Sequence, residues 1–315
     1  MSDVKLKLRG HESFYIREGW LTKGIVAINK DKYILSNTIS AIDELGVGSA
    51  MVKSIRYWLQ ALSLTDEKRG EKGKRYQELS EDFGKILFEN DKYFEDLGTL
   101  YLLHYKLVSN KDLATTWNLF FNSIKATEMT KYHMEEEVKQ LILNIDPQYE
   151  ISERSLSDDC NCLVKTYFAE KNDLKNPEDN MICPFSDLGL IKKEHIRGKD
   201  EIIYKTVPER NKLDKLIVLY VIMDNLGDKQ STTIKNLIED ENNIGSVFNL
   251  DKNTINYYID ILRDEGYLRV RNYLVPNIKF IMKEGKSYCL NKIIIIYCSY
   301  SLFCPFFIFY YNSSA

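Results

Sequence analysis

The spacing of apolar and polar residues in the first third of the chain predicts two helices joined by a tight turn. Residues 37–45 repeat apolar positions at helical intervals, and Ser36 or Asn37 precedes them as a polar N-cap. Gly46-Val47-Gly48 interrupts this pattern. The next run, 49–62, places its apolar residues on one helical face behind a serine cap. A helix, a glycine turn and a second helix are typical of a helix-turn-helix unit.

Strand-like alternation surrounds this pair of helices. A short strand is predicted over 4–8, where every second residue is apolar. Two more strands are predicted at 62–65 and 76–79, and residues 68–75 between them form a polar loop with two glycines. Two helices followed by such a hairpin indicate a winged helix.

The middle of the chain is predominantly helical by the same criterion. Five helices are predicted there, at 83–88, 97–108, 114–121, 130–143 and 156–170. Thr130 supplies one N-cap, and Pro147 ends that block. A polar stretch over 171–180 is predicted to be a linker, followed by a docking loop at 182–191 and a strand at 201–206.

From residue 214 onward the helix-turn-helix pattern recurs. The predicted elements are helices over 216–226, 231–238 and 251–265 and strands over 267–271 and 274–280. Ser231 and Asp251 supply the N-caps, Gly266 ends the last helix, and the strands turn near Asn272. This outline predicts a second winged helix.

These patterns together predict the fold class. We expect a mainly α-helical protein in which two winged helix-turn-helix modules, with short β wings, surround a helical middle. The expected parts are an N-terminal winged-helix and helical domain, a helical and linker region, a C-terminal winged-helix domain and an atypical hydrophobic tail. Their ranges are 1–147, 148–207, 208–285 and 286–315.

The tail contains a charge-free segment, 293–311, that is rich in Ile, Phe and Tyr. Its length alone is sufficient for a membrane span, but the flanking charges that orient such spans are nearly absent. A membrane anchor and an aberrant C-terminus translated from AT-rich sequence are the two interpretations. We expect the second, and no membrane partner.

Composition changes this picture in two respects. The 315 residues include 43 Lys and Arg against 46 Asp and Glu, a formal charge of −3, so a protein that is basic all over is excluded. Any nucleic-acid surface must therefore be local. A polar N-terminus and scattered cysteines indicate a cytoplasmic protein with free thiols. Cys160, Cys162 and Cys183 lack the spacing that is typical of a zinc site.

Candidate DNA contacts lie off the apolar face of the 49–62 helix and in the loop 68–75, which has five positive charges and one negative. Long basic and amide side chains there reach phosphates and base edges. The predicted DNA-binding residues are Ser49, Lys53, Arg56, Gln60, Lys68, Arg69, Lys72, Lys74 and Arg75, with Lys252, Asn253 and Asn256 in the more acidic C-terminal module. A solvated charged face that docks proteins is the alternative.

One polar cluster near aromatic residues is the catalytic candidate. His11 is its proton acceptor, Glu12 a metal ligand or orienting group, and Arg17 with Lys23 the phosphate clamps. Hydrolytic nicking usually requires a divalent metal, so we expect Mg²⁺ or Mn²⁺ if the protein nicks DNA and no cofactor otherwise. No set of metal ligands is assigned. The alternative for these residues is a structural cluster at a domain seam.

Several motifs in the first half of the chain are specific enough to indicate a family. They are His11-Glu12-x-Phe14-Tyr15-x-Arg17-x-Gly19-Trp20-Leu21-x-Lys23-Gly24, Leu45–Gly48, Met51–Trp58, Phe83–Phe88, Asp96–His104 and Ala114–Trp117. The chain thereby resembles, over about residues 5–285, the bacterial family called domain of unknown function 4007. Ser49-Ala50 stands where the family tends to have Lys-Asn, which removes one positive charge. The tail has no counterpart in the family.

The resemblance implies a setting in DNA phosphorothioation, in which sulfur replaces a non-bridging phosphate oxygen as a defence mark. Genes of this family lie next to genes for a cysteine desulfurase, a sulfur-transferring enzyme and an ATPase. One member of the family looks like the subunit that binds and nicks DNA. The implied function is a DNA-binding component of such a modification and anti-phage defence system, with nicking as its sharper form. Double-stranded DNA and the sulfur-transfer and ATPase subunits are the implied partners. The alternative is a non-catalytic adaptor that docks those subunits through its winged helices.

Overall fold

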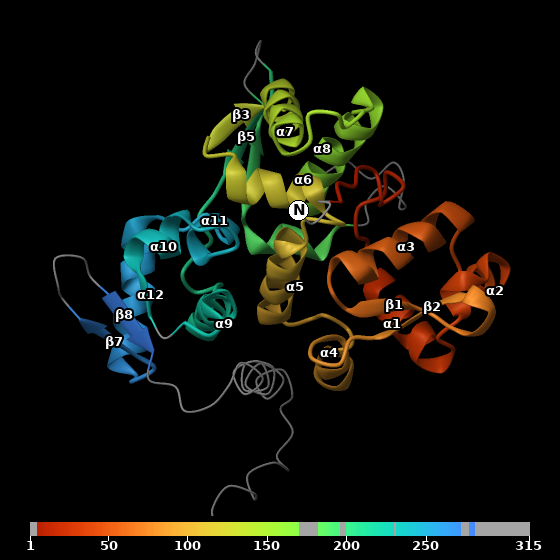
Figure 1. Ribbon diagram of the computed structural model, residues 1–315, viewed down its shortest axis with the longest axis horizontal. Helices are drawn as coiled ribbons and strands as arrows, with labels where there is room; N and C mark the ends of the chain where they lie inside the picture. Colours follow the sequence, from red (N-terminus) through yellow and green to blue (C-terminus); the bar gives the residue numbers. More distant parts are fainter. Residues whose placement is uncertain (1–4, 170–181, 196–199, 230, 272–276, 281–315) are drawn as a thin grey trace, which may run out of the picture.

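Three groups of helices with small antiparallel sheets make up the protein (Figure 1). The computed structural model describes residues 5–169, 182–195, 200–229, 231–271 and 277–280. Helices predominate, as predicted, and the described strands form three small sheets. The helices from the middle of the chain lie between the N-terminal and the C-terminal groups (Figure 1).

The N-terminal group consists of four α-helices and a β-hairpin. Its elements are α1 Trp20–Lys30, α2 Thr38–Leu45, α3 Ser49–Ala61, β1 Thr65–Arg69, β2 Arg75–Leu79 and α4 Gly84–Asn90. The predicted cap of α2 is confirmed, since Asn37 Oδ1 accepts from Ser40 N at 3.4 Å. Gly46, with φ of +64°, ends that helix in the left-handed conformation. On α3, Ile55 and Trp58 are fully buried and anchor the helix in the core.

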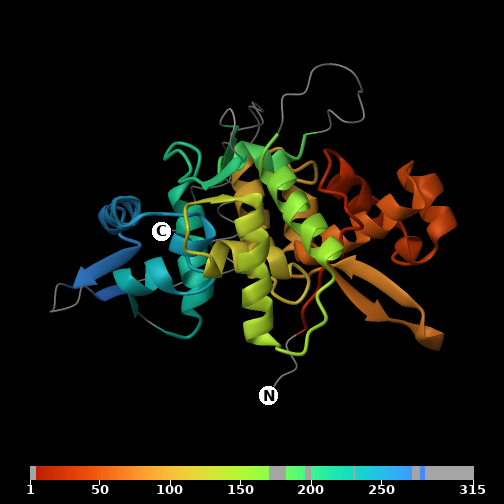
Figure 2. The same ribbon diagram turned by 90° about the horizontal axis from the view of Figure 1, so that it is seen from above.

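The hairpin differs from its prediction in extent. The sequence pattern predicts strands at 62–65 and 76–79, whereas β1 and β2 pair over their whole lengths. Lys68, Arg69 and Arg75 therefore lie on strands and not in the connecting loop. The alternation rule misses these positions because Lys68, Arg69 and Arg75 are all exposed at the far end of the hairpin, where no apolar stripe is needed and backbone pairing alone extends the strands. Figure 2 shows the hairpin projecting away from the central helices.

The strand predicted over 4–8 is absent from the described part of that segment, residues 5–8. Lys7 N donates to Thr115 Oγ1 at 2.9 Å, and Arg9 N donates to Asp159 Oδ1 at 2.7 Å. Side chains of the central helices thus satisfy backbone groups that a neighbouring strand would otherwise bind.

The central group combines helices with a sheet in the order β3-β5-β4. Its elements are α5 Leu97–Ser109, α6 Thr115–Asn118, a π-helical segment Leu119–Ser123, β3 Glu128–Thr130, α7 Lys131–Ile145, α8 Glu153–Tyr167, β4 Ile191–Glu194 and β5 Ile202–Lys205. Thr130 caps α7 as predicted. Helix α8 begins earlier than the predicted 156–170 because Ser152 Oγ accepts from Ser155 N. The predicted linker 171–180 lies outside the described residues.

The C-terminal group consists of short helices beside a sheet in the order β6-β8-β7. Its elements are α9 Lys215–Leu226, β6 Ser231–Thr233, α10 Ile234–Glu239, α11 Ile244–Val247, α12 Lys252–Asp264, β7 Leu268–Arg271 and β8 Asn277–Phe280. The prediction that Ser231 begins a helix is wrong. Residues 231–233 pair with β8, and Thr233 caps α10 instead. Asp251 caps α12 as predicted, accepting from Thr254 N at 2.7 Å. The turn near Asn272 lies outside the described residues.

Buried residues from all three groups form one continuous apolar cluster. Tyrosine hydroxyls reinforce the contacts between groups: Tyr57 donates to Leu113 O and Tyr105 donates to Asp224 Oδ2, both at 2.9 Å. The central helices therefore hold the two outer groups in place.

Among the described residues, no helix combines the length and apolar character that crossing a bilayer requires. The charge-free segment 293–311 lies outside those residues, within 281–315.

Candidate nucleic-acid interface

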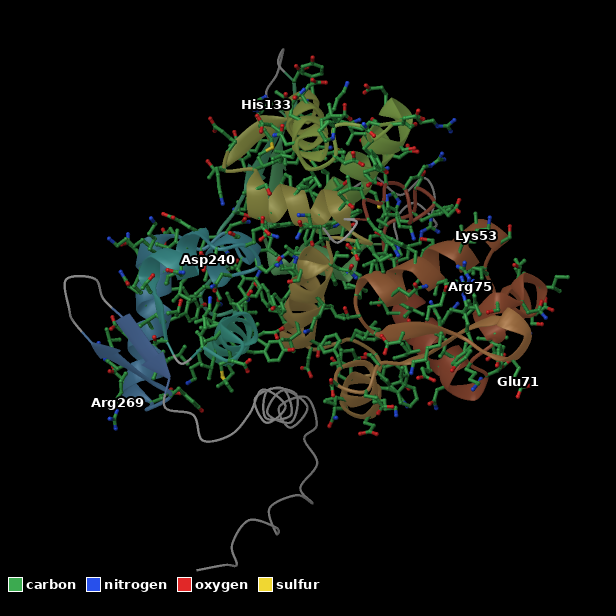
Figure 3. All side chains as sticks on the ribbon, viewed as in Figure 1. Lys53, Glu71, Arg75, His133, Asp240 and Arg269 are labelled. Atoms are coloured by element: carbon green, nitrogen blue, oxygen red, sulfur yellow. The ribbon has the colours of Figure 1, made fainter. Side chains whose placement is uncertain are left out.

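Helix α3 has one buried and one exposed face. Ser49 and Lys53 are exposed, whereas Arg56 and Gln60 are half-buried. Within the described part of the chain, Lys53 has no ion-pair partner, and Figure 3 places it on the outer side of the helix. The positions predicted from the sequence to face DNA therefore divide into an exposed pair and a pair that other side chains partly cover.

The β1–β2 hairpin presents further basic side chains. Arg69 and Lys74 are exposed. Lys68 pairs across the hairpin with Glu78, and the hydrogen bond and charge of that carboxylate raise the pKa of the lysine. The side chain of Lys72 lies outside the described part of the structure. Among the described side chains of the hairpin, Arg69 and Lys74 thus have no carboxylate partner, whereas Lys68 and Arg75 are each paired with a carboxylate.

Glu67 on β1 collects three of the predicted DNA-binding side chains. Its Oε2 accepts from Arg56 Nε at 3.0 Å, from Arg56 Nη2 and from Gln60 Nε2 at 3.3 Å. Its Oε1 accepts from Arg75 Nη1 at 3.2 Å. These hydrogen bonds join α3 to both strands of the hairpin, so the helix and the hairpin form one surface.

The C-terminal candidates lie along α12, where Lys252, Asn253 and Asn256 are exposed. Beside them is a groove of about 620 Å³ between α10, α12 and β7. Its apolar floor is formed by Ile234, Ile238, Ile259 and Val270. Acidic residues reduce the positive charge of this face, since Arg263 pairs with both Asp260 and Asp264. This surface is less basic than that of α3 and the hairpin.

The proposed proton acceptor, His11, is completely buried in the seam between the N-terminal and central groups. Its Nε2 donates to Asp159 Oδ1 at 2.7 Å, and its ring stacks on Trp58 with centroids 5.9 Å apart. Asp159 also accepts from Arg9 N and from Thr116 Oγ1, each at 2.7 Å. A histidine held in this way joins the N-terminal segment to α8.

The other three catalytic candidates point to different surroundings. Glu12 is exposed on a turn. The Arg17 guanidinium carbon lies 5.5 Å from the centre of the Trp20 ring. Lys23 Nζ donates to Leu45 O at 3.2 Å, at the end of α2. The described contacts thus bring His11 to Asp159 and to aromatic rings, and bring Lys23 to a helix C-terminus.

Two acidic residues that sequence reasoning missed organise these sites: Glu67 in the basic surface and Asp159 around His11. For Glu67, the available signal is an acidic residue next to the basic run 68–75 and eleven positions after Arg56. For Asp159, no local signal exists, because its partner His11 is 148 residues away.

Comparison with known proteins identifies the family. Residues 8–287 match the family described as protein of unknown function DUF4007. The chain belongs to the DUF4007 family. This confirms the resemblance of the N-terminal motifs. Two crystal structures of SspB, one of them bound to magnesium ion, share its fold with TM-scores of 0.80 and 0.78. Each is 24% identical to this chain and covers 92% of it and 86% of SspB. No curated protein matches the chain.

The side chains that could bind a metal ion in this DUF4007 chain are its cysteines and the residues around His11. Burial raises the pKa of the Cys160, Cys162 and Cys183 thiols, that of Cys183 to about 12, which disfavours the metal-binding thiolate. No group of three or more His, Cys, Asp or Glu within the described ranges is placed to hold a metal ion. His11 and Glu12 do not fit a magnesium site as they stand, because Mg²⁺ takes oxygen ligands and His11 is enclosed with Asp159.

Proposed function

We propose that this DUF4007 protein is the DNA-binding component of a phosphorothioation-linked modification and defence system. The observation that carries the proposal is the joined surface of α3 and the β1–β2 hairpin, on which Lys53, Arg69 and Lys74 are exposed. Exposed Lys and Arg bind backbone phosphates and release counterions from DNA. The phosphorothioation setting rests on membership of the family.

In this proposal, residues 20–79 and 215–280 act as winged helices. Helix α3 would enter the major groove, where Ser49 and Lys53 face base edges, and the hairpin would follow the phosphate backbone. The C-terminal module would add Lys252, Asn253 and Asn256 of α12 as weaker contacts. Its acidic neighbours Asp260 and Asp264 make it the secondary element.

The test is a fluorescence-anisotropy titration of a duplex of random sequence at several salt concentrations. Arg69→Gln combined with Lys74→Gln should weaken binding similarly on every sequence and lower the salt-dependence slope by about 0.9 for each phosphate that the variant no longer neutralises. Lys92→Gln combined with Lys131→Gln removes the same charge from exposed positions elsewhere and should leave the slope unchanged. Equal effects of the two pairs would remove the hairpin from the interface.

The rival function is a non-catalytic adaptor that docks the sulfur-transfer and ATPase subunits. The observation in its favour is the apolar floor of the groove beside α12, which DNA would not require. Under this function, the subunits would bind the protein without DNA, and its affinity for naked duplex would be weak and insensitive to the hairpin variants.

A more specific version of the DNA-binding function is that the protein also nicks DNA, and the resemblance to the family supports it. The residues to be tested are those predicted from the sequence, His11, Glu12, Arg17 and Lys23, although their described contacts differ and His11 with Glu12 forms no magnesium site as it stands. Plasmid relaxation with Mg²⁺ or Mn²⁺ tests it, comparing the wild type with His11→Ala and Glu12→Gln at equal folded fraction and DNA affinity. Glu12→Gln is the sharper variant, because Glu12 is exposed whereas His11 also stabilises the seam. Equal nicking by all three proteins would remove the cluster from the reaction.

A further inference from the structure

The single negative charge of Glu67 faces the two positive charges of Arg56 and Arg75. Arg56 and Arg75 both donate to the Glu67 carboxylate, and the amide of Gln60 completes the ring of donors. The side chains of Arg56 and Glu67 are 25% and 22% exposed, while Arg75 is 58% exposed, so the cluster opens to solvent on the hairpin side. Two guanidinium groups therefore share one anion at the edge of the proposed DNA surface.

This donor set suits a phosphate as well as a carboxylate. A guanidinium presents planar, paired N–H groups that match either anion, and hydrogen bonds between charged groups are the stronger kind. Glu67 is partly exposed on a strand of a two-stranded hairpin, and the residues on either side of it, Asp66 and Lys68, are exposed, so its side chain can turn outward into solvent.

We propose that Arg56, Gln60 and Arg75 form a single site for a DNA backbone phosphate, and that Glu67 occupies this site in the free protein as its built-in anion. The proposal rests on the DNA-binding function above and defines how that surface is used. DNA must displace Glu67 to reach the site, and the displaced carboxylate then repels neighbouring phosphates.

The consequence is discrimination between duplexes. A duplex that binds through its phosphates alone gains little at this site, because it replaces one anion with another. A duplex whose bases also bind Ser49 and Lys53 can compensate for breaking the hydrogen bonds of Glu67. Glu67 therefore acts as a repulsive element that lowers affinity for non-specific DNA.

The experiment measures binding of the full chain to a random duplex over a salt series. Glu67→Gln should raise affinity about tenfold at 0.1 M salt and steepen the slope by about 0.9, the effect of neutralising one additional phosphate. The matched control is Asp66→Asn, which removes the same charge from the adjacent, exposed position on β1. It should change affinity much less, because Asp66 does not contact the Arg56 cluster.

A double-mutant cycle separates release of the site from a change in net charge. In the wild type, where Arg56 is already bonded to Glu67, Arg56→Gln should change DNA affinity only slightly. In the Glu67→Gln background, Arg56→Gln should abolish the increase in DNA affinity. Glu67→Ser carries the same expectation as Glu67→Gln, and circular dichroism confirms that each variant is folded.

The outcomes distinguish this inference from the function on which it rests. If Glu67→Gln gains no more than Asp66→Asn while the Arg69 and Lys74 variants still weaken binding, the phosphate site is wrong and DNA binding stands. If neither the wild type nor Glu67→Gln binds duplex, both fail.

Discussion

Acidification should destabilise the protein through His104, a buried histidine that the fold keeps neutral. Its Nε2 donates to Val247 O at 2.7 Å, and its Nδ1 accepts from Tyr167 Oη at 2.7 Å. Both hydrogen bonds are satisfied by the neutral ring. Burial lowers the pKa of His104 to about 3, against a smaller opposing effect of the Val247 hydrogen bond.

The size of the expected loss of stability follows from the difference between the pKa of His104 in the folded protein and in the unfolded chain. The unfolded chain protonates this histidine near its ordinary pKa of about 6.5, whereas the folded protein does so far lower. The unfolded state therefore binds more protons between these values, and stability falls as pH falls through that window. Between pH 7 and pH 5 the folded ring stays neutral, so the unfolded pKa alone sets the loss of stability, which is about 2 kcal/mol.

Urea denaturation at pH 7 and pH 5 measures this loss, with His104→Gln as the test variant. Glutamine can place an amide N–H near Val247 O but does not titrate. The wild type should lose about 2 kcal/mol more than His104→Gln on acidification, since the other titrating groups contribute equally to both. His133→Gln, at an exposed position, should behave as the wild type. Equal losses in wild type and His104→Gln would refute the reasoning.

Two further predictions concern packing and a buried carboxylate. Gly84→Ala should cost about 1–3 kcal/mol in urea denaturation, because its Cβ would lie 2.0 Å from Leu64 O, whereas Gly48→Ala, with open space around the new Cβ, should cost less than about 1 kcal/mol. Asp159→Ala should cost about 3 kcal/mol or more, because three donors lose their acceptor in a buried seam. Asp158→Ala, which removes a part-exposed partner of Arg9, should cost less than about 1 kcal/mol, and similar destabilisation by the two substitutions would contradict this assignment.

Local signals in the sequence were sufficient for most of the helices and many of their ends, although they did not predict α1. The caps at Asn37, Thr130 and Asp251 and the glycine break after α2 are found where they were predicted. The predicted serine cap of α3 is wrong, because Gly48 is the N-cap and Ser49 is the first residue of the helix. Each confirmed cap involves a side chain and a backbone group within about one helical turn, so neighbouring residues alone encode it. The family motifs belong to the same class of information, since they are read directly from the order of residues.

Strands depended on partners that the local sequence does not contain. Ser231 has a good capping side chain, yet residues 231–233 pair with β8, which lies far along the chain. At the N-terminus, the alternating residues 5–8 form no strand, because Lys7 and Arg9 bond to side chains of the central helices. Alternation shows that a segment can pair, and only the tertiary structure supplies the partner.

The candidate site divides in the same way. By itself, the sequence determined that this is a mainly helical protein with a basic segment after a helix-turn-helix pattern, because composition and short spacings encode those features, and its motifs carried the resemblance to the DUF4007 family. The tertiary structure alone decided which cations are open: it placed Glu67 against Arg56 and Arg75 and left Lys53 exposed. It also enclosed His11 with Asp159 across 148 residues. The charge that a surface presents depends on which residues the folded chain brings within hydrogen-bond distance, and those distances exist only after the chain has folded.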